Sequence, residues 1–242
     1  MHEKYKSYLT VVIDNRFYKT YNNNKVIKGR KRATGRYEIT HKRILESGKM
    51  LFLKDGYERT NLRELCKTAG VTTGAFYGYY DSKLDLFDEL IGIHYRKITE
   101  YFQKTVDKFE SLSQEKQLQS MEDISSKSLD WMLNYSYENI RALRILLTKS
   151  DGTPFYNFVD RLIEIEEIST ERFILLIGRD DYEISESDKR FFHMVSTGLF
   201  NAFSELIIHD MSFEEAKRQM DLLRRFYTAG WMEILKDISD EI

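Results

Sequence analysis

Apolar residues of this 242-residue chain recur at helical spacing over most of its length. From about residue 96 onward they follow one another at steps of three and four, which gathers side chains on one face of a helix. The segments with this pattern run near 96–110, 118–134, 137–149, 155–177, 185–209 and 213–237. Polar breaks separate them at 111–113, 151–154, 178–181 and 210–212. The pattern predicts a C-terminal region made of helices.

The first part of the chain predicts shorter helices with well-defined ends. A helix that carries Ile44 and Phe52 is expected to stop at Gly56. The next begins after Asn61, whose side chain can cap it, and Glu64 completes the pattern of a capping box. One proline and twelve glycines in the whole chain favour long helices over a turn-rich sheet protein.

Two further helices follow closely. Gly70 ends the preceding helix, and Thr72 caps the next one, which runs from Thr73 to about Tyr80. Ser82 caps a fourth helix. Two short helices joined by a tight glycine-containing turn form a helix-turn-helix, which offers its second helix to the major groove. We therefore predict that residues 61–80 bind double-stranded DNA.

The second helix of this pair opens with small side chains. Threonine hydroxyls can reach bases or phosphates, and a threonine methyl or Ala75 can contact the methyl group of thymine. The residues predicted to face the bases are Thr72, Thr73 and Ala75. Those predicted to contact the flanking phosphate backbone are Tyr77, Tyr79 and Lys83. Phe76 and Tyr80 are interpreted as core packing.

Residues 39–90 also resemble the N-terminal signature of the TetR family, without a gap. The motifs that carry the resemblance are Ile44-Leu45, Leu51-Phe52, Gly56-Tyr57, Leu62–Leu65, Ala69–Val71, Gly74, Phe76-Tyr77, Tyr79-Tyr80, Ser82-Lys83 and Leu86-Phe87. It implies an all-α fold with an N-terminal three-helix DNA-binding domain and a C-terminal helical domain that binds a ligand and dimerises. The DNA-contacting positions that it implies are Thr72, Thr73 and Ala75 on the recognition helix, Tyr77 and Lys83 on phosphates, and Asn61 as a cap that can touch the backbone.

The sequence departs from this family pattern in three places. Gly48 stands where the family favours alanine, which costs about 1 kcal/mol of helix propensity. Gly78 and Tyr79 replace a common pair of an aromatic residue and histidine, which puts the family's phosphate contacts there in doubt. The extension before residue 30 is longer than the usual arm, and nothing in the resemblance explains it.

Charge is divided unevenly along the chain. Residues 1–87 contain 18 lysines and arginines against 9 acidic residues, a balance of +9, whereas residues 88–242 contain 19 against 30, a balance of −11. A basic front and an acidic rear indicate that the front meets a polyanion. Within a basic arm over residues 25–43, Arg30, Lys31 and Arg32 are predicted to follow phosphates or enter the minor groove. The alternative is that this arm is simply solvated.

These patterns divide the chain into three regions. Residues 1–30 form an extension that is expected to be mobile, residues 31–88 the helix-turn-helix domain, and residues 89–242 the helical ligand-binding and dimerisation domain. The single cysteine, Cys66, excludes an internal disulfide and fits a reducing cytoplasm. No run of eighteen apolar residues occurs, so no membrane span is expected. Scattered histidines and the lack of a nucleotide-binding loop or a GxSxG or HExxH motif predict no metal, cofactor or catalytic site.

The C-terminal region offers candidate sites for a ligand and a partner. Its many aromatic residues could line a cavity for a small hydrophobic or aromatic ligand, although an ordinary aromatic core explains each of them equally well. The candidate lining residues are Trp131, Met132, Tyr135 and Phe158. By resemblance, the helices near 185–209 and 213–237 form a homodimer interface. Their apolar stripes are Phe191, Val195, Leu199, Ala202, Phe203 and Leu206 on the first, and Met220, Leu223, Tyr227, Gly230, Trp231 and Ile234 on the second.

The leading hypothesis is a sequence-specific transcriptional regulator, a repressor that a small molecule releases from a palindromic operator. The alternative keeps the same DNA-binding front without any small effector, so that a protein partner controls it or it acts architecturally. A cavity too small for a metabolite would favour this alternative. An enzyme is the least favoured class, because no recognisable set of catalytic groups occurs.

Overall fold

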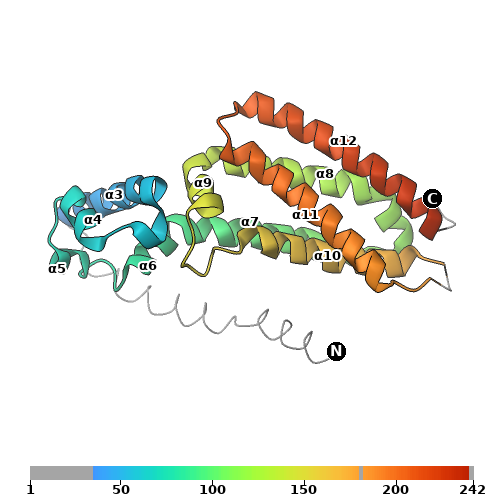
Figure 1. Ribbon diagram of the computed structural model, residues 1–242, viewed down its shortest axis with the longest axis horizontal. Helices are drawn as coiled ribbons and strands as arrows, with labels where there is room; N and C mark the ends of the chain where they lie inside the picture. Colours follow the sequence, from blue (N-terminus) through green and yellow to red (C-terminus); the bar gives the residue numbers. More distant parts are fainter. Residues whose placement is uncertain (1–34, 180–181, 240–242) are drawn as a thin grey trace.

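The computed structural model describes residues 35–179 and 182–239, and every regular element in these residues is a helix. The predicted all-α fold is thereby confirmed for the described part of the chain. A small head contains α3 (Gly35–Arg59), α4 (Leu62–Ala69), α5 (Thr73–Phe76) and α6 (Lys83–Phe87). The larger body contains η1 (Asp88–Gly92, one turn of π-helix), α7 (Ile93–Glu110), α8 (Gln114–Glu138), α9 (Ile140–Thr148), α10 (Phe158–Ile177), α11 (Glu186–Ile208) and α12 (Phe213–Ile238). The head lies at one end of the long axis (Figure 1).

The helix ends are set by the local signals that the sequence contains. Asn61 caps α4 by accepting a hydrogen bond from the Arg63 N–H at 2.8 Å, one residue earlier than a capping box with Glu64 requires. Gly70 ends α4 in the left-handed region at φ 63°, which glycine adopts without a steric cost. Ser185 caps α11 in a complete capping box with Asp188, and Ser82 and Ser212 cap α6 and α12.

Gly56 and Gly48 shape α3 in different ways. Gly56 has φ 81° and ψ 168° and interrupts α3 three residues before its end at Arg59, where the sequence predicts a stop. Gly48 remains helical, and a β-carbon there would lie 3.0 Å from both Leu86 and Leu90. The glycine therefore lets α3 approach α6 and η1 closely, which gives this departure from the family pattern a packing reason.

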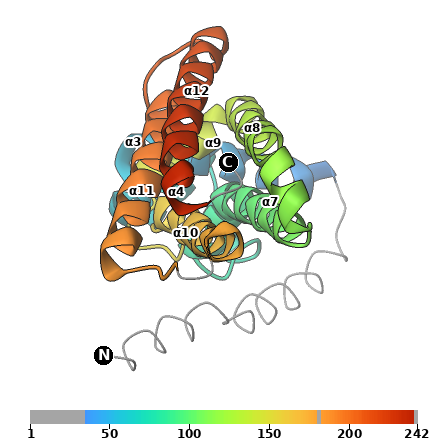
Figure 2. The same ribbon diagram turned by 90° about the vertical axis from the view of Figure 1, so that its right-hand side faces the viewer.

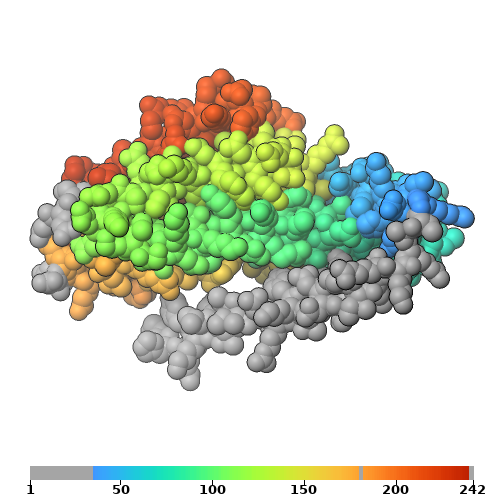
Figure 3. Space-filling view, turned by 180° about the vertical axis from the view of Figure 1, so that it is seen from behind, coloured from blue at the N-terminus to red at the C-terminus, as the bar shows by residue number. Residues whose placement is uncertain are grey.

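The five long helices of the body pack in a closed ring. Each of α7, α8, α12, α11 and α10 contacts the next in that order, and α10 contacts α7 again. Figure 2 shows this bundle along the long axis of the molecule. Figure 3 shows α7 and α8 forming a continuous face that extends from the head toward the far end of the body. Side chains from all five helices therefore face one another inside the ring.

The head and the body are joined without a loop. The helices α6, η1 and α7 follow one another directly, so the predicted boundary at residue 88 falls inside one helical rod. The apolar core also continues across it, because Phe87 packs on Phe52 of the head and on Phe155 of the body. Asp88, 4% exposed, pairs with Arg96 at 2.5 Å beside this junction. The predicted domain boundary stays a prediction, and the extension over residues 1–30 lies outside the described residues.

One described helix, α11, is long and apolar enough to cross a membrane by length and composition alone. The sequence criterion of an unbroken apolar run does not detect it, because polar residues interrupt its apolar ones. A core helix passes the same test, and Phe192, Phe200 and Phe203 of α11 are at most 2% exposed inside the bundle.

Candidate nucleic-acid interface and ligand cavity

The N-terminal turn of α5 is exposed at the tip of the head (Figure 1). Thr72, Thr73 and Ala75 are all solvent-exposed. The Thr72 hydroxyl accepts a hydrogen bond from the Ala75 N–H at 3.1 Å, which confirms its predicted role as the cap of this helix. Its own hydroxyl hydrogen is left to donate outward. The three residues predicted to face bases are therefore brought together on one accessible surface.

Gly74 leaves the middle of this surface bare. A β-carbon there would meet only the Thr72 hydroxyl, at 4.0 Å, so packing inside the protein does not require glycine. Its φ is not in the left-handed region, so backbone conformation does not require it either. The glycine instead lets another molecule approach the α5 backbone closely, as a DNA groove would.

Two rings behind α5 hold it against the head. Phe76 is fully buried and Tyr80 is 3% exposed, which confirms their interpretation as core residues, whereas Tyr77 is 53% exposed. The Tyr80 hydroxyl lies 2.8 Å from His41 Nε2, and burial raises the pKa of this tyrosine. The helix itself ends at Phe76, several residues before the predicted end near Tyr80, because residues 77–79 form turns.

Tyr79 and Lys83 make contacts inside the protein. Tyr79 is half-buried, stacks on Tyr37 with ring centroids 4.5 Å apart and donates to the Tyr37 carbonyl at 3.4 Å. The Lys83 ammonium donates to the carbonyls of Tyr57 at 2.5 Å and Thr60 at 3.0 Å, with a longer contact of 3.4 Å to Glu58. It also lies 4.2 Å from the centre of the Tyr57 ring, and burial lowers its pKa. Both side chains thus brace the head, and their predicted phosphate contacts stay predictions.

Other predicted residues of the head are placed as follows. Asn61 is exposed at the start of α4, and Arg30, Lys31 and Arg32 lie outside the described residues. Arg43 lies in the predicted basic arm, but sequence reasoning missed its contact: its guanidinium donates to the Gly70 carbonyl at 3.3 Å and so ties α3 to the turn between α4 and α5. No local pattern signals this contact, because the partners lie 27 positions apart.

Cys66 is buried in the head. The side chain is 2% exposed, and burial raises the pKa of the thiol, although a hydrogen bond with Thr73 lowers it in part. A buried thiol with a raised pKa is a poor nucleophile. The residue therefore acts as a small core side chain.

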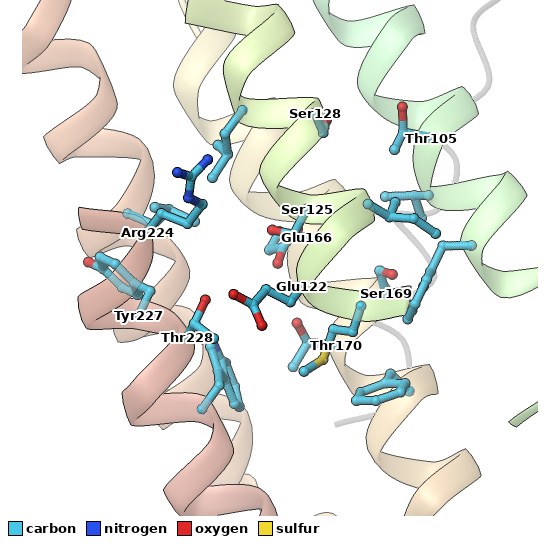
Figure 4. A pocket seen from close by; sticks show the side chains of 18 of the residues that line it. Thr105, Glu122, Ser125, Ser128, Glu166, Ser169, Thr170, Arg224, Tyr227 and Thr228 are labelled. Carbon is cyan, nitrogen blue, oxygen red and sulfur yellow. The ribbon is translucent and has the colours of Figure 1, made fainter. Parts of the chain in front are cut away.

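The ring of body helices encloses a cavity of about 150 Å³. All five helices contribute to its wall, among them Phe102 of α7, Ser128 of α8, Glu166 of α10, Leu199 of α11 and Tyr227 of α12. Most of the wall is apolar, and Figure 4 shows the polar side chains that interrupt it.

None of the four candidate lining residues from the sequence lies on this cavity. Met132 and Phe158 are at most 1% exposed within the packed core. Trp131 stacks on Tyr101 and Tyr135, with ring centroids 3.6 and 5.2 Å away, and the Tyr135 hydroxyl lies 2.8 Å from His94 Nδ1. These half-buried rings bridge α7 and α8 away from the cavity wall. Aromatic content thus indicated the region in which the cavity lies, but the four candidate side chains lie outside its wall.

The predicted interface stripes also face inward for the most part. Phe203, Leu206 and Met220 are at most 3% exposed, and Leu199 and Trp231 line the cavity. The large apolar side chains that α11 and α12 expose are different ones, namely Met194 at 63%, Leu222 at 49%, Phe226 at 72% and Met232 at 39%. Each of the two helices therefore has an inward and an outward apolar face, and the homodimer interface over 185–209 and 213–237 stays a prediction.

In DNA-binding proteins of the helix-turn-helix class, the exposed second helix of the motif is the element that enters the major groove. Residues 44–90 match the family described as bacterial regulatory proteins, tetR family. The similarity to this family therefore covers the helix-turn-helix of the head and its junction with the body.

Two curated relatives are similar to a stretch of the chain of about the same length. The chain is 40% identical over 53 residues to the HTH-type transcriptional repressor BepR of Brucella suis biovar 1 (strain 1330), which is 22% of this chain and 25% of that protein. It is 43% identical over 51 residues to the HTH-type transcriptional regulator AcrR of Shigella flexneri, or 21% of this chain and 24% of that protein. The matches thus span about a quarter of each relative.

The fold over most of the chain is similar to that of a solved structure. A TetR-like transcriptional regulator from Rhodococcus sp. RHA1 is similar with a TM-score of 0.52 and 20% identity, covering 80% of this chain and 96% of that chain. At this identity the similarity shows the fold alone.

Proposed function

We propose that this protein is a dimeric transcriptional repressor that binds a palindromic operator through α5 and is released from it by a small molecule. The observation that carries the proposal is the exposed turn at Thr72–Ala75, bare at Gly74 and held from behind by Phe76. Repression, as opposed to activation, is supported by the name of one curated relative, a transcriptional repressor. The protein of this proposal is a cytoplasmic one without catalytic activity.

Dimerisation follows from how such a domain reads DNA. One short recognition helix reads only a few base pairs, and two copies about one helical turn apart read a palindrome. The exposed Met194, Leu222 and Phe226 give α11 and α12 an apolar surface that a second copy would cover. The distance between the two α5 helices would then depend on how the two bodies meet.

The contacts between head and body support control by a ligand. The Tyr57 N–H of the head donates to the Lys149 carbonyl of the body at 3.0 Å, and α9 packs against α3. The rod of α6, η1 and α7 leads from the head to the wall of the cavity. A ligand that favours one arrangement of the body helices therefore also biases the position of α5.

One observation favours the alternative, in which a protein partner controls the same DNA-binding head. The cavity of about 150 Å³ is smaller than the roughly 300–1,000 Å³ of common ligand pockets. An apolar cavity of this size does, however, hold a ring the size of benzene. The ligand of the proposed function is accordingly a small one.

Fluorescence anisotropy with DNA fragments that flank the protein's own gene tests the DNA-binding part. We expect one fragment to bind more tightly than random DNA of equal length, with an affinity that falls steeply as salt rises. Thr73→Ala should weaken specific binding by about tenfold, because one base contact is worth about 1–3 kcal/mol. Thr148→Ala, an exposed threonine of the body, is the matched control. Equal binding of every fragment and of random DNA would refute the proposal.

A further inference from the structure

The cavity contains a carboxylate that nothing in the described chain neutralises. Glu166 of α10 lines the cavity, and Figure 4 shows its side chain pointing into it. Within residues 35–179 and 182–239, no hydrogen bond or ion pair reaches this carboxylate. Burial raises its pKa to about 7. Proteins ordinarily pair a buried carboxylate, because leaving its charge unpaired is costly.

The cationic residue of the cavity wall, Arg224 of α12, is already engaged. Its guanidinium donates to Asp221 at 2.5 Å, to the Ser126 hydroxyl at 2.5 Å and, more weakly, to Asp130 at 3.4 Å. Two carboxylates therefore balance its single charge.

A second acid gives the cavity a negative balance. Glu122 of α8 is exposed and also points into the cavity (Figure 4), and no ion pair within the described residues engages it. With Arg224 balanced by its own partners, Glu122 and Glu166 leave negative charge that a bound cation would offset.

The remaining wall suits the body of an organic cation. Its aromatic members offer ring faces that attract positive charge, namely Phe102, Phe109, Phe173, Phe200, Tyr227 and Trp231. The Ser128 hydroxyl, on a residue only 2% exposed, has no hydrogen-bond partner within the described residues. It is a second polar group on the wall that can accept a hydrogen bond from an ammonium.

We infer that the cavity binds a small monovalent organic cation, a protonated amine on a ring-sized apolar body, with its charge facing Glu166. Metal binding is not favoured, since the described residues contain no group of three or more histidine, cysteine or acidic side chains that could hold an ion. An anion is disfavoured by the two carboxylates. The inference rests on the proposed function, because it names the ligand class of the proposed effector site.

Calorimetry with two probes of matched shape tests the charge requirement. We expect 2-phenylethylammonium to bind at least about tenfold more tightly than 2-phenylethanol, which lacks the charge. Glu166→Gln keeps the shape of the side chain and should abolish this preference. Glu164→Gln, on the same helix and outside the cavity wall, should preserve it. Equal binding of both probes, binding of neither, or an unchanged preference in Glu166→Gln would overturn the inference.

The pH dependence of binding adds a second readout. The titratable groups that face Glu166 across the cavity are Glu122 from α8 and Arg224 and Tyr227 from α12. Binding of the ammonium should tighten from about pH 6 to about pH 8, as Glu166 ionises, and Glu166→Gln should remove most of this change. A pH dependence that persists unchanged in Glu166→Gln would overturn the assignment to this residue.

Failure of this inference and failure of the proposed function give different results. The calorimetry needs no DNA, so a protein that binds no specific operator can still show the Glu166-dependent preference. Conversely, calorimetry can show charge-dependent binding while the ammonium leaves the operator complex intact. That result would support the cation site and would contradict its role in releasing the DNA.

Discussion

At the scale of single residues, two partly buried ionisable side chains, Lys83 and Glu166, differ in the partners that surround them. The Lys83 ammonium is surrounded by backbone carbonyls at the end of α3, which satisfy its hydrogens. The Glu166 carboxylate has no such partners within the described chain, and burial shifts its pKa toward the neutral form. A satisfied charge stabilises a structure, whereas an unsatisfied one is retained for a function or at a cost in stability.

Glu166 is therefore predicted to destabilise the protein as pH rises. Its pKa of about 7 in the folded state lies above the value of 4.5 for a solvated glutamate. Below that lower value both states are protonated and no penalty exists. Between the two values the unfolded state alone ionises, so the penalty grows and levels off at about 3 kcal/mol above pH 7.

Urea unfolding of Glu166→Gln measures this penalty. The variant should be more stable than the natural protein at about pH 8, by an amount on the order of 1–3 kcal/mol, and nearly equal to it at about pH 4. Glu164→Gln, which loses an ion pair with Arg161 outside the cavity, should show no such gain. A stability difference that is the same at both pH values would contradict the prediction.

At the scale of elements, α5 is a helix of only four residues, and residues outside it fix its position. Its cap comes from Thr72, its anchoring from Phe76, and the turn before it is held by Arg43 through the Gly70 carbonyl. So short a helix is not stable alone, because nucleation outweighs the few hydrogen bonds it forms. The packing of α3 and α4 therefore determines the geometry of the reading surface.

Gly74→Ala tests whether glycine is required at this position for the stability of α5 or for its contact with DNA. The added methyl has open space inside the protein, with the nearest atom 4.0 Å away, and alanine favours helix by up to about 1 kcal/mol. Thermal stability followed by circular dichroism should stay equal or rise. Operator affinity should fall by about tenfold, because the methyl stands where DNA approaches the backbone. Unchanged affinity would show that the DNA does not approach this turn closely.

At the scale of the whole molecule, a helical ring forms the cavity and a continuous rod joins it to the head. The ring of α7, α8, α12, α11 and α10 leaves apolar side chains on the outer sides of α11 and α12. In a single copy the Phe226 ring is 72% exposed. Covering such side chains on association is worth about 25 cal/mol for each Å² of apolar area removed from water.

Phe226→Arg tests the proposed dimer at this face. A charged side chain in an apolar interface lacks a partner, so the variant should be monomeric at micromolar concentration in analytical ultracentrifugation. Its helix content should be unchanged, because Phe226 contributes little to the core of its own chain. Operator binding should weaken, since a monomer reads half a palindrome. Tyr156→Arg, at 66% exposure on the loop before α10, is the matched control and should remain dimeric.

The sequence by itself determined the features that depend on neighbours along the chain. The cap at Thr72, the left-handed Gly70, the capping box at Ser185 and the breaks between the body helices are all local, because each involves residues within about four positions. The order of such signals was also sufficient to indicate the helix-turn-helix and its family. Periodicity showed that α11 and α12 are amphipathic helices.

Only the tertiary structure decided which face of each helix is buried and which groups meet. The side chains of Glu122, Glu166 and Arg224 come from three helices and line one cavity. Even the nearer acid, Glu166, is 58 positions from Arg224 along the chain. Lys83 reaches carbonyls 23 to 26 positions away, and the regular stripes of α11 and α12 pack inward. The physical reason is that periodicity gives the relative angle of side chains around one helix, whereas burial depends on the helices that pack against it.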